Sequence, residues 1–160
     1  MPLFIPSRRF FTLFDETQTQ SASTSFVNSA TQITLPIGTY TYEGLTGGST
    51  VSSTGGVSVD STMASGFSVN ANHTLYQGTS YFGSTFNNSF TRIDTNSQLF
   101  VSLNLDANAS TKFIYGRLAG VLKVTSDTTF GFKIAQRTAT DASNPATLMN
   151  RSYINFSKIA

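Results

Sequence analysis

The sequence predicts an all-β protein, an antiparallel β-sandwich of the jelly-roll type with about eight strands. Two observations favour this fold class. Charged residues make up only 11% of the 160-residue chain and Glu occurs twice, so the residues from which helices are built are scarce. Phe occurs 14 times and Tyr 6 times, and apolar residues alternate with polar ones as they do in half-buried strands.

The N-terminal residues 1–20 are predicted to be an extended arm, and residues 21–160 a single sandwich domain. The first 14 residues are apolar, but Arg8 and Arg9 interrupt the apolar run instead of preceding it, as they would in a secretory signal. No stretch approaches the roughly 18 apolar residues of a membrane span. We expect a partner to order the arm, because its phenylalanines are too apolar to remain in water: Phe4, Phe10, Phe11 and Phe14.

The clearest strands are five runs of alternating residues, at positions 31–35, 38–43, 98–105, 129–135 and 152–159. Tyr40 and Tyr42 share one face of the second run, and Phe130, Phe132 and Ile134 share one face of the fourth. A further strand-like stretch contains two glycines, which suggest a bulge, a bend or a close approach of the backbone: Gly116 and Gly120 within residues 111–124.

Clusters of turn-forming residues separate the strands, at positions 44–50, 52–56, 125–128 and 141–145. The cluster at 125–128 is expected to be a hairpin loop between two neighbouring strands. The polar segment 44–97 is expected to combine long loops with short strands near 56–60 and 66–70.

Catalytic signals are weak, so the protein is predicted not to be an enzyme and to need no cofactor. The chain has no Cys, which excludes disulfides, thiol catalysis and Cys-ligated zinc. His73, the one histidine, has no carboxylate near it in the sequence. It could still belong to a Ser-His-Asp triad, although no G-x-S-x-G motif leads into a helix. Asp15 and Glu16 are the one adjacent acidic pair, and neighbours on a strand face opposite ways.

The net charge of +2 is unevenly distributed along the chain. Residues 10–111 contain six acids and one base, whereas residues 112–160 contain seven bases and two acids. The bases are spaced singly, as solvent-facing strand positions would be, so we predict neither a nucleic-acid partner nor a membrane partner. Opposite charges could also complement each other between copies of an oligomer.

The order of motifs in the last third adds a more specific signal. Residues 115–124 lead through a short polar turn to residues 129–136, then a Thr/Ala/Asn-rich loop and a terminal strand that begins at Ser152. Together with residues 26–44, this order resembles jelly-roll virion proteins of tailed bacteriophages, which include capsid decoration proteins, head fibres and tail-fibre tips. The resemblance covers residues 24–160. Asn150 and Arg151 precede the last strand where such proteins often have Gly-Ser.

This resemblance implies a non-enzymatic, homotrimeric capsid decoration (cement) protein on the outer surface of the virion head. Its partners would be the major capsid protein or other virion proteins. The arm would anchor it through Phe4, Arg8, Arg9, Phe10, Phe11 and Phe14. Packing between copies would bury Tyr115, Phe130 and Phe132.

Two alternatives remain open at this point. The first is a tail-associated adsorption or receptor-binding tip, which would bind a host-surface glycan through loops 44–56 or 70–90, with Tyr76, Tyr81 and Phe82 as candidates. The second is a monomeric, secreted carbohydrate-binding module or hydrolase fragment.

Overall fold

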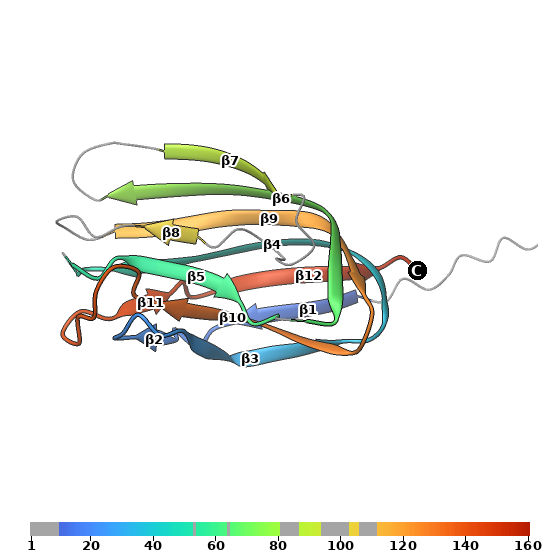
Figure 1. The fold of residues 1–160 in the computed structure, drawn as a ribbon, viewed down its shortest axis with the longest axis horizontal. Helices are drawn as coiled ribbons and strands as arrows, with labels where there is room; N and C mark the ends of the chain where they lie inside the picture. Colours follow the sequence, from blue (N-terminus) through green and yellow to red (C-terminus); the bar gives the residue numbers. More distant parts are fainter. Residues whose placement is uncertain (1–9, 53, 64, 81–86, 94–102, 106–111) are drawn as a thin grey trace, which may run out of the picture.

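The computed structural model describes residues 10–52, 54–63, 65–80, 87–93, 103–105 and 112–160, and its regular elements are all β-strands. Twelve strands form two antiparallel sheets, most of them running along the long axis of the molecule (Figure 1). The predicted all-β sandwich is therefore confirmed.

Sheet A has eight strands and sheet B has four. The main order in sheet A is β1 (Phe10–Asp15), β12 (Ser152–Lys158), β4 (Gly38–Thr50), β9 (Lys112–Val124), β6 (Phe67–Ser80) and β7 (Asn87–Ile93). The short strand β11 (Ala146–Leu148) also pairs with β4, and β2 (Gln20–Ser21) pairs with β11. Sheet B has the order β3 (Val27–Leu35), β10 (Thr128–Ala135), β5 (Val57–Ser61) and β8 (Leu103–Leu105).

The connectivity is that of a jelly roll. The first half of the chain pairs with the second half in reverse order: β1 with β12 and β4 with β9 in sheet A, and β3 with β10 and β5 with β8 in sheet B. A chain that folds back on itself and is then rolled up alternates between two sheets in this way. The paired strands β6 and β7 extend sheet A beyond β9. These eight rolled strands match the expected number, and β2 and β11 are too short to show an alternating pattern.

The core between the sheets is rich in aromatic rings. Phe156 of β12 lies beside Tyr40 and Tyr42 of β4, with ring centroids 6.4 and 6.1 Å apart. It also meets Phe130 of β10 across the sandwich at 5.3 Å, and Phe130 packs edge-on against Phe132 at the same distance. All five rings are buried, on the faces that the alternation of their strands predicts.

The N-terminal arm is shorter than predicted. Residues 10–15 and 20–21 are strands of sheet A, so the boundary at residue 20 lies too far along the chain. The reason is that outward and inward side chains alternate along Phe10–Asp15. This segment can therefore pair with the edge of β12 and turn its inward side chains toward the core. Residues 1–9 lie outside the described residues.

The predicted turn at residues 44–50 is instead the second half of the long strand β4. Its glycines serve close packing: a Cβ added at Gly44 would collide with the carbonyl oxygen of Tyr153, and one at Gly47 with that of Ile114. Glycine therefore marks a close approach between strands here, although it is more often a turn residue.

The predicted hairpin at residues 125–128 is wrong. This turn carries the chain from β9 in sheet A to β10 in sheet B, and the two strands do not pair with each other. The backbone N–H groups of Thr125 and Ser126 donate to the carbonyl oxygen of Gly66, which ties the crossing to the start of β6. A short polar turn looks the same in sequence whether the chain stays in one sheet or crosses to the other.

Two other predictions concern the long strands. The pairing of β9 with β4 runs without a break, so Gly116 and Gly120 introduce no bulge against that neighbour. The register shift of this region lies on β6, between Val69 and Ala71. In the predicted run 98–105, Leu103 is buried in β8, whereas residues 98–102 lie outside the described residues.

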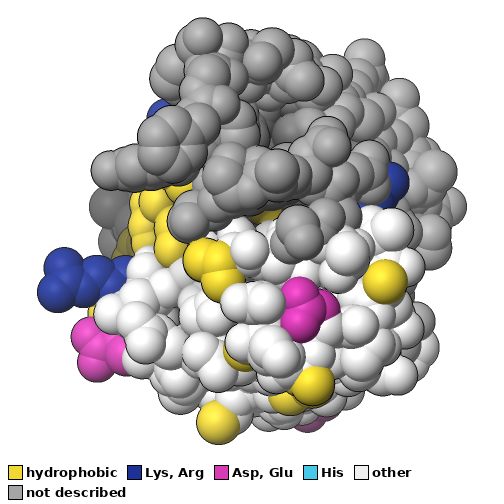
Figure 2. All heavy atoms as spheres, turned by 90° about the vertical axis from the view of Figure 1, so that its left-hand side faces the viewer, with side chains coloured by type: hydrophobic (Ala, Val, Ile, Leu, Met, Phe, Trp, Pro, Cys, Tyr) yellow, Lys and Arg dark blue, Asp and Glu magenta, His cyan; other side chains and the backbone are white. Residues whose placement is uncertain are grey.

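A clamp of polar side chains joins two loops at the end of the sandwich shown in Figure 2, whose described surface is mostly neither hydrophobic nor charged. The Ser52 hydroxyl donates to the Asp141 carboxylate at 2.6 Å, and the Asn144 amide donates to the same oxygen at 3.2 Å. Buried Gln136 donates to the carbonyl oxygens of Asp141 and Asn144. The hydrogen bond from Ser52, followed by the one from Asn144, lowers the pKa of Asp141.

Replacing Phe156 should test the aromatic core. We expect Phe156→Ala to lower the free energy of unfolding by about 3–5 kcal/mol, because it removes the ring that joins the sheets and leaves a cavity. Urea denaturation measures this change. Asn155→Ala, next to it on the opposite face of β12, should cost only about 0.5 kcal/mol. Equal losses in the two variants would contradict the central role of Phe156.

The clamp predicts a dependence of stability on pH. Because the folded state lowers the pKa of Asp141 from its usual 3.8, ionised Asp141 stabilises the fold above about pH 4, and this contribution is lost as the pH falls through the lowered pKa. Asp141→Asn should therefore be less stable than the wild type at neutral pH, and the difference should shrink below about pH 4. Urea denaturation across this pH range checks it, and a constant difference would contradict the prediction.

Candidate functional site

The strand β1 forms one edge of sheet A (Figure 1) and pairs with β12 alone among the described strands. Its outward residues are Phe10, Thr12 and Phe14, and we call this strand with its outward side chains the β1 edge. Phe10 is 67% exposed and Phe14 46% exposed. Exposed rings on an edge strand are typical of a contact surface, since such edges are otherwise usually short, charged or covered.

The inward residues of β1 belong to the core. Leu13 is buried, and the Phe11 ring packs edge-on against Tyr40 with centroids 5.9 Å apart. Phe11 is therefore occupied within the chain, which corrects its prediction as an anchoring residue. The other predicted anchors, Phe4, Arg8 and Arg9, lie outside the described residues.

A buried carboxylate holds the end of β1 in place. Asp15 accepts a hydrogen bond from the Ser29 hydroxyl of β3, which joins the edges of the two sheets. It also accepts hydrogen bonds from the backbone N–H and the hydroxyl of Thr17, at 2.9 and 2.6 Å. The sequence singled out Asp15 only as part of an acidic pair. Its structural role depends on Ser29, whose proximity no local pattern reveals.

A shallow depression of about 420 Å³ adjoins the β1 edge on the outer face of sheet A. Phe10 and the side chains of three neighbouring strands line it, among them Thr12, Glu43 and Asn155. Tyr42 borders the depression, but its ring is buried in the core, and this burial raises the pKa of the phenol. The depression gives the β1 edge a mixed surface of exposed rings, hydroxyls and one carboxylate.

The predicted oligomer-interface residues do not lie together on the surface. Phe130 and Phe132 are fully buried, because β10 turns these alternate side chains toward sheet A. This corrects their prediction as contacts between copies. Tyr115, on β9, is half-buried on the opposite face of its strand from the core residue Ile114, and its ring stacks on Phe113 at 6.1 Å.

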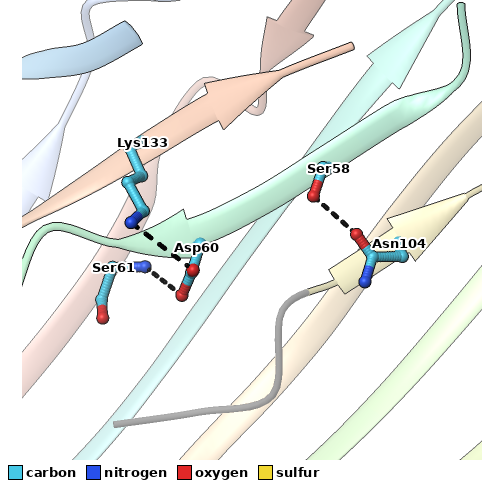
Figure 3. A network of polar contacts seen from close by, with 5 residues as sticks. All are labelled: Ser58, Asp60, Ser61, Asn104 and Lys133. Carbon is cyan, nitrogen blue, oxygen red and sulfur yellow. Dashed lines mark hydrogen bonds and ion pairs between the residues drawn. The ribbon is translucent and has the colours of Figure 1, made fainter. Parts of the chain in front are cut away.

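The outer face of sheet B carries polar groups that pair with each other (Figure 3). Lys133 of β10 lies 3.6 Å from the carboxylate of Asp60 on β5, and Ser58 donates to the Asn104 side chain of β8 at 2.5 Å. The ammonium group of Lys133 also lies 4.7 Å from the ring centroid of Phe26. These contacts pair the polar side chains of β5 with those of β8 and β10, while Asn28 and Gln32 of β3 remain exposed.

The predicted glycan-binding residues and the lone histidine add no described side chain to a site. Tyr81 and Phe82 lie outside the described residues. His73 and Tyr76 lie on β6, of which the structure describes the backbone at these positions. The part of the chain that the structure describes holds no group of three His, Cys, Asp or Glu side chains suited to a metal ion. In the same residues, no helix has the length and hydropathy of a membrane span.

Comparison with known proteins adds little to this geometry. No protein-family model matches the chain, and no curated protein matches it. Among solved structures, the chain is similar to a mutant VP2 protein of infectious bursal disease virus in derived T=1 particles, with 11% sequence identity and a TM-score of 0.23. The alignment covers 95% of this chain but only 39% of the VP2 chain. A likeness at this level carries no argument about function.

Proposed function

We propose that this chain is a non-enzymatic virion structural protein, specifically a decoration (cement) protein that attaches to the outer surface of a tailed-phage head and stabilises the particle. The observation that carries the proposal is the β1 edge, which presents two exposed phenylalanines directly after the apolar and basic residues 1–9. Jelly rolls serve as capsid and as lectin domains, so the fold is compatible with this role without deciding it.

The attachment would combine three kinds of contact. Burial of Phe10 and Phe14 against a partner would contribute about 1.5–3 kcal/mol for each ring. Arg8 and Arg9 could form charge-assisted hydrogen bonds with carboxylates of the partner. The free backbone edge of β1 could also accept a partner strand. Many copies on one particle surface would together bind more firmly than a single copy.

Attachment can be tested with a deletion that respects the fold. Removing residues 2–9 and changing Phe10 and Phe14 to Ser should leave the sandwich folded but weaken binding by about 100-fold or more, since apolar contact area is lost. The measurement is co-sedimentation with heads stripped of this protein. A deletion through residue 14 would also remove β1 and expose Phe156, so it would confuse attachment with folding.

The matched control for this test is Phe26→Ser, which removes another exposed ring, 42% exposed, beside Lys133 on sheet B. This variant should still co-sediment. Undiminished attachment of the β1-edge variant would contradict the proposal.

We also propose that the protein is a homotrimer, as closed symmetry would allow outer-face residues such as Tyr115 to be shared between copies. Light scattering coupled to size-exclusion chromatography should give a mass three times the 17.2 kDa of the chain. A monomeric mass at all concentrations tested would contradict this part of the proposal.

A further inference from the structure

A second hollow lies beside the end of β1 at Asp15: Gln18, which lines it, follows Asp15 by three residues, and the backbone N–H of Arg151, next to the lining residue Asn150, donates to Asp15. The hollow encloses about 280 Å³ on sheet A, where β11 and β9 flank the end of β4. Phe10 begins β1 at the opposite end, close to the C-terminus (Figure 1). We call this hollow the β11 pocket, and it contains none of the side chains that carry the proposed attachment.

Small residues in the central strand create the pocket. Ser49 of β4 is paired with Thr147 of β11 on one side and with Phe113 of β9 on the other. Gly47, two residues earlier on the face of Ser49, has no side chain, whereas Gly48 lines the pocket although its own side-chain position faces Val57 in the core. Because the central strand carries little side-chain volume here and both flanking strands carry more, the surface is recessed between them.

One wall of the pocket is a flat aromatic ring held in a fixed orientation. Phe113 is 37% exposed, and its ring is stacked on that of Tyr115 with only 13° between the planes. Half-buried Met149 adds further apolar surface to the lining, whereas the Leu148 side chain is buried in the core. Such a lining offers apolar surface on which a ligand ring can pack, together with a small number of polar groups that can fix its orientation.

The polar groups of the lining are uncharged. Gln18 and Asn150 contribute primary amides and Ser49 a hydroxyl, and none of these three side chains hydrogen-bonds to another residue in the described part of the chain. On the outer face of sheet B, by comparison, Lys133 pairs with Asp60, and Ser58 donates to Asn104 (Figure 3). The β11 pocket therefore retains donors and acceptors that a ligand can use.

The backbone fixes the positions of these amides. Gln18 has a φ of 46° and Arg151, next to Asn150, has a φ of 67°. Residues other than glycine rarely adopt such values outside sites where the surrounding structure enforces them. The enforcing contacts are backbone hydrogen bonds: Leu148 donates to Thr19 at 2.8 Å, and Arg151 donates to Asp15 at 2.9 Å.

We propose that the β11 pocket binds one ring of a neutral saccharide. A flat aromatic ring can stack against the C–H face of a sugar, while amides and hydroxyls match the alternating donors and acceptors of its hydroxyl groups. The absence of charge among the lining residues disfavours an anionic or cationic ligand. The volume lies just below the roughly 300–1,000 Å³ of sites for drug-sized ligands, which suits a single ring.

The test uses defined saccharides and the full-length protein. Saturation-transfer difference NMR and calorimetry would be carried out with maltotriose, cellotriose, mannobiose, galactobiose and N,N′-diacetylchitobiose, together with sialyllactose as an anionic comparison. We expect at least one neutral saccharide to bind with a dissociation constant of about 1 mM or lower. The saturation-transfer signal should be strongest for the protons of one ring.

Three variants locate the binding site. Ser49→Leu fills the recess, Phe113→Ala removes the aromatic wall and Asn150→Ala removes a rim amide, and each should weaken binding by about tenfold or more. Thr41→Leu is the matched control for Ser49→Leu, since Thr41 lies on the same face of β4 outside the pocket. It should bind as the wild type does. Asn150→Ala changes only a rim side chain, which keeps the test valid if a larger change impairs folding.

Three results would overturn the proposal: no neutral saccharide binds at millimolar concentration, the three pocket variants bind as well as the wild type, or sialyllactose binds more tightly than every neutral probe. Co-sedimentation of Asn150→Ala with stripped heads is a separate readout. It should be normal, so that a failure of saccharide binding is distinguishable from a failure of particle attachment.

Discussion

The contact between Phe156 and Phe130 is the interaction on which the rest of the molecule depends. It joins β12 of sheet A to β10 of sheet B, and the neighbouring rings of Tyr40, Tyr42 and Phe132 extend it along both sheets. Because the chain has so few charges, the two sheets are held together mainly by the burial of apolar surface. Once these rings face inward, the period of two in each strand decides which residues face outward.

The outer faces that result are chemically different. On sheet B, Lys133 pairs with Asp60 and Ser58 with Asn104, both between neighbouring strands. On sheet A, exposed rings mark the β1 edge, and an aromatic wall with amides that have no partner among the described residues marks the β11 pocket. The two features share no lining side chain, although Gln18 and Asn150 of the pocket lie near the Asp15 end of β1.

Much of the fold could be predicted from local patterns, and particular residues show where this ends. The alternation around Tyr40 and Phe130 correctly indicated which side chains share a face, but not that Phe130 belongs to the core and not to an interface. It could not indicate the partner of each strand, so residues 125–128 were interpreted as a hairpin although the chain crosses between sheets there. Phe11 was interpreted as an anchor because the segment around it is apolar. Its ring instead packs on Tyr40, which is distant in sequence, so no local pattern indicates this contact. Of the candidate site residues, Phe10 and Phe14 are exposed and their anchoring role stays a prediction, whereas Phe132 is a core residue.

The sequence by itself determined the class of structure, because alternation of apolar and polar side chains and the scarcity of helix-forming residues are local properties. It also indicated that the segment around Phe10 is unusually apolar. Only the tertiary structure decided which of those rings remain exposed, because burial depends on pairing with β12, which is distant in sequence. The β11 pocket is likewise a product of tertiary structure: Gln18, Ser49, Phe113 and Asn150 come from four separate segments, and only the rolled pairing of the chain brings them to one surface.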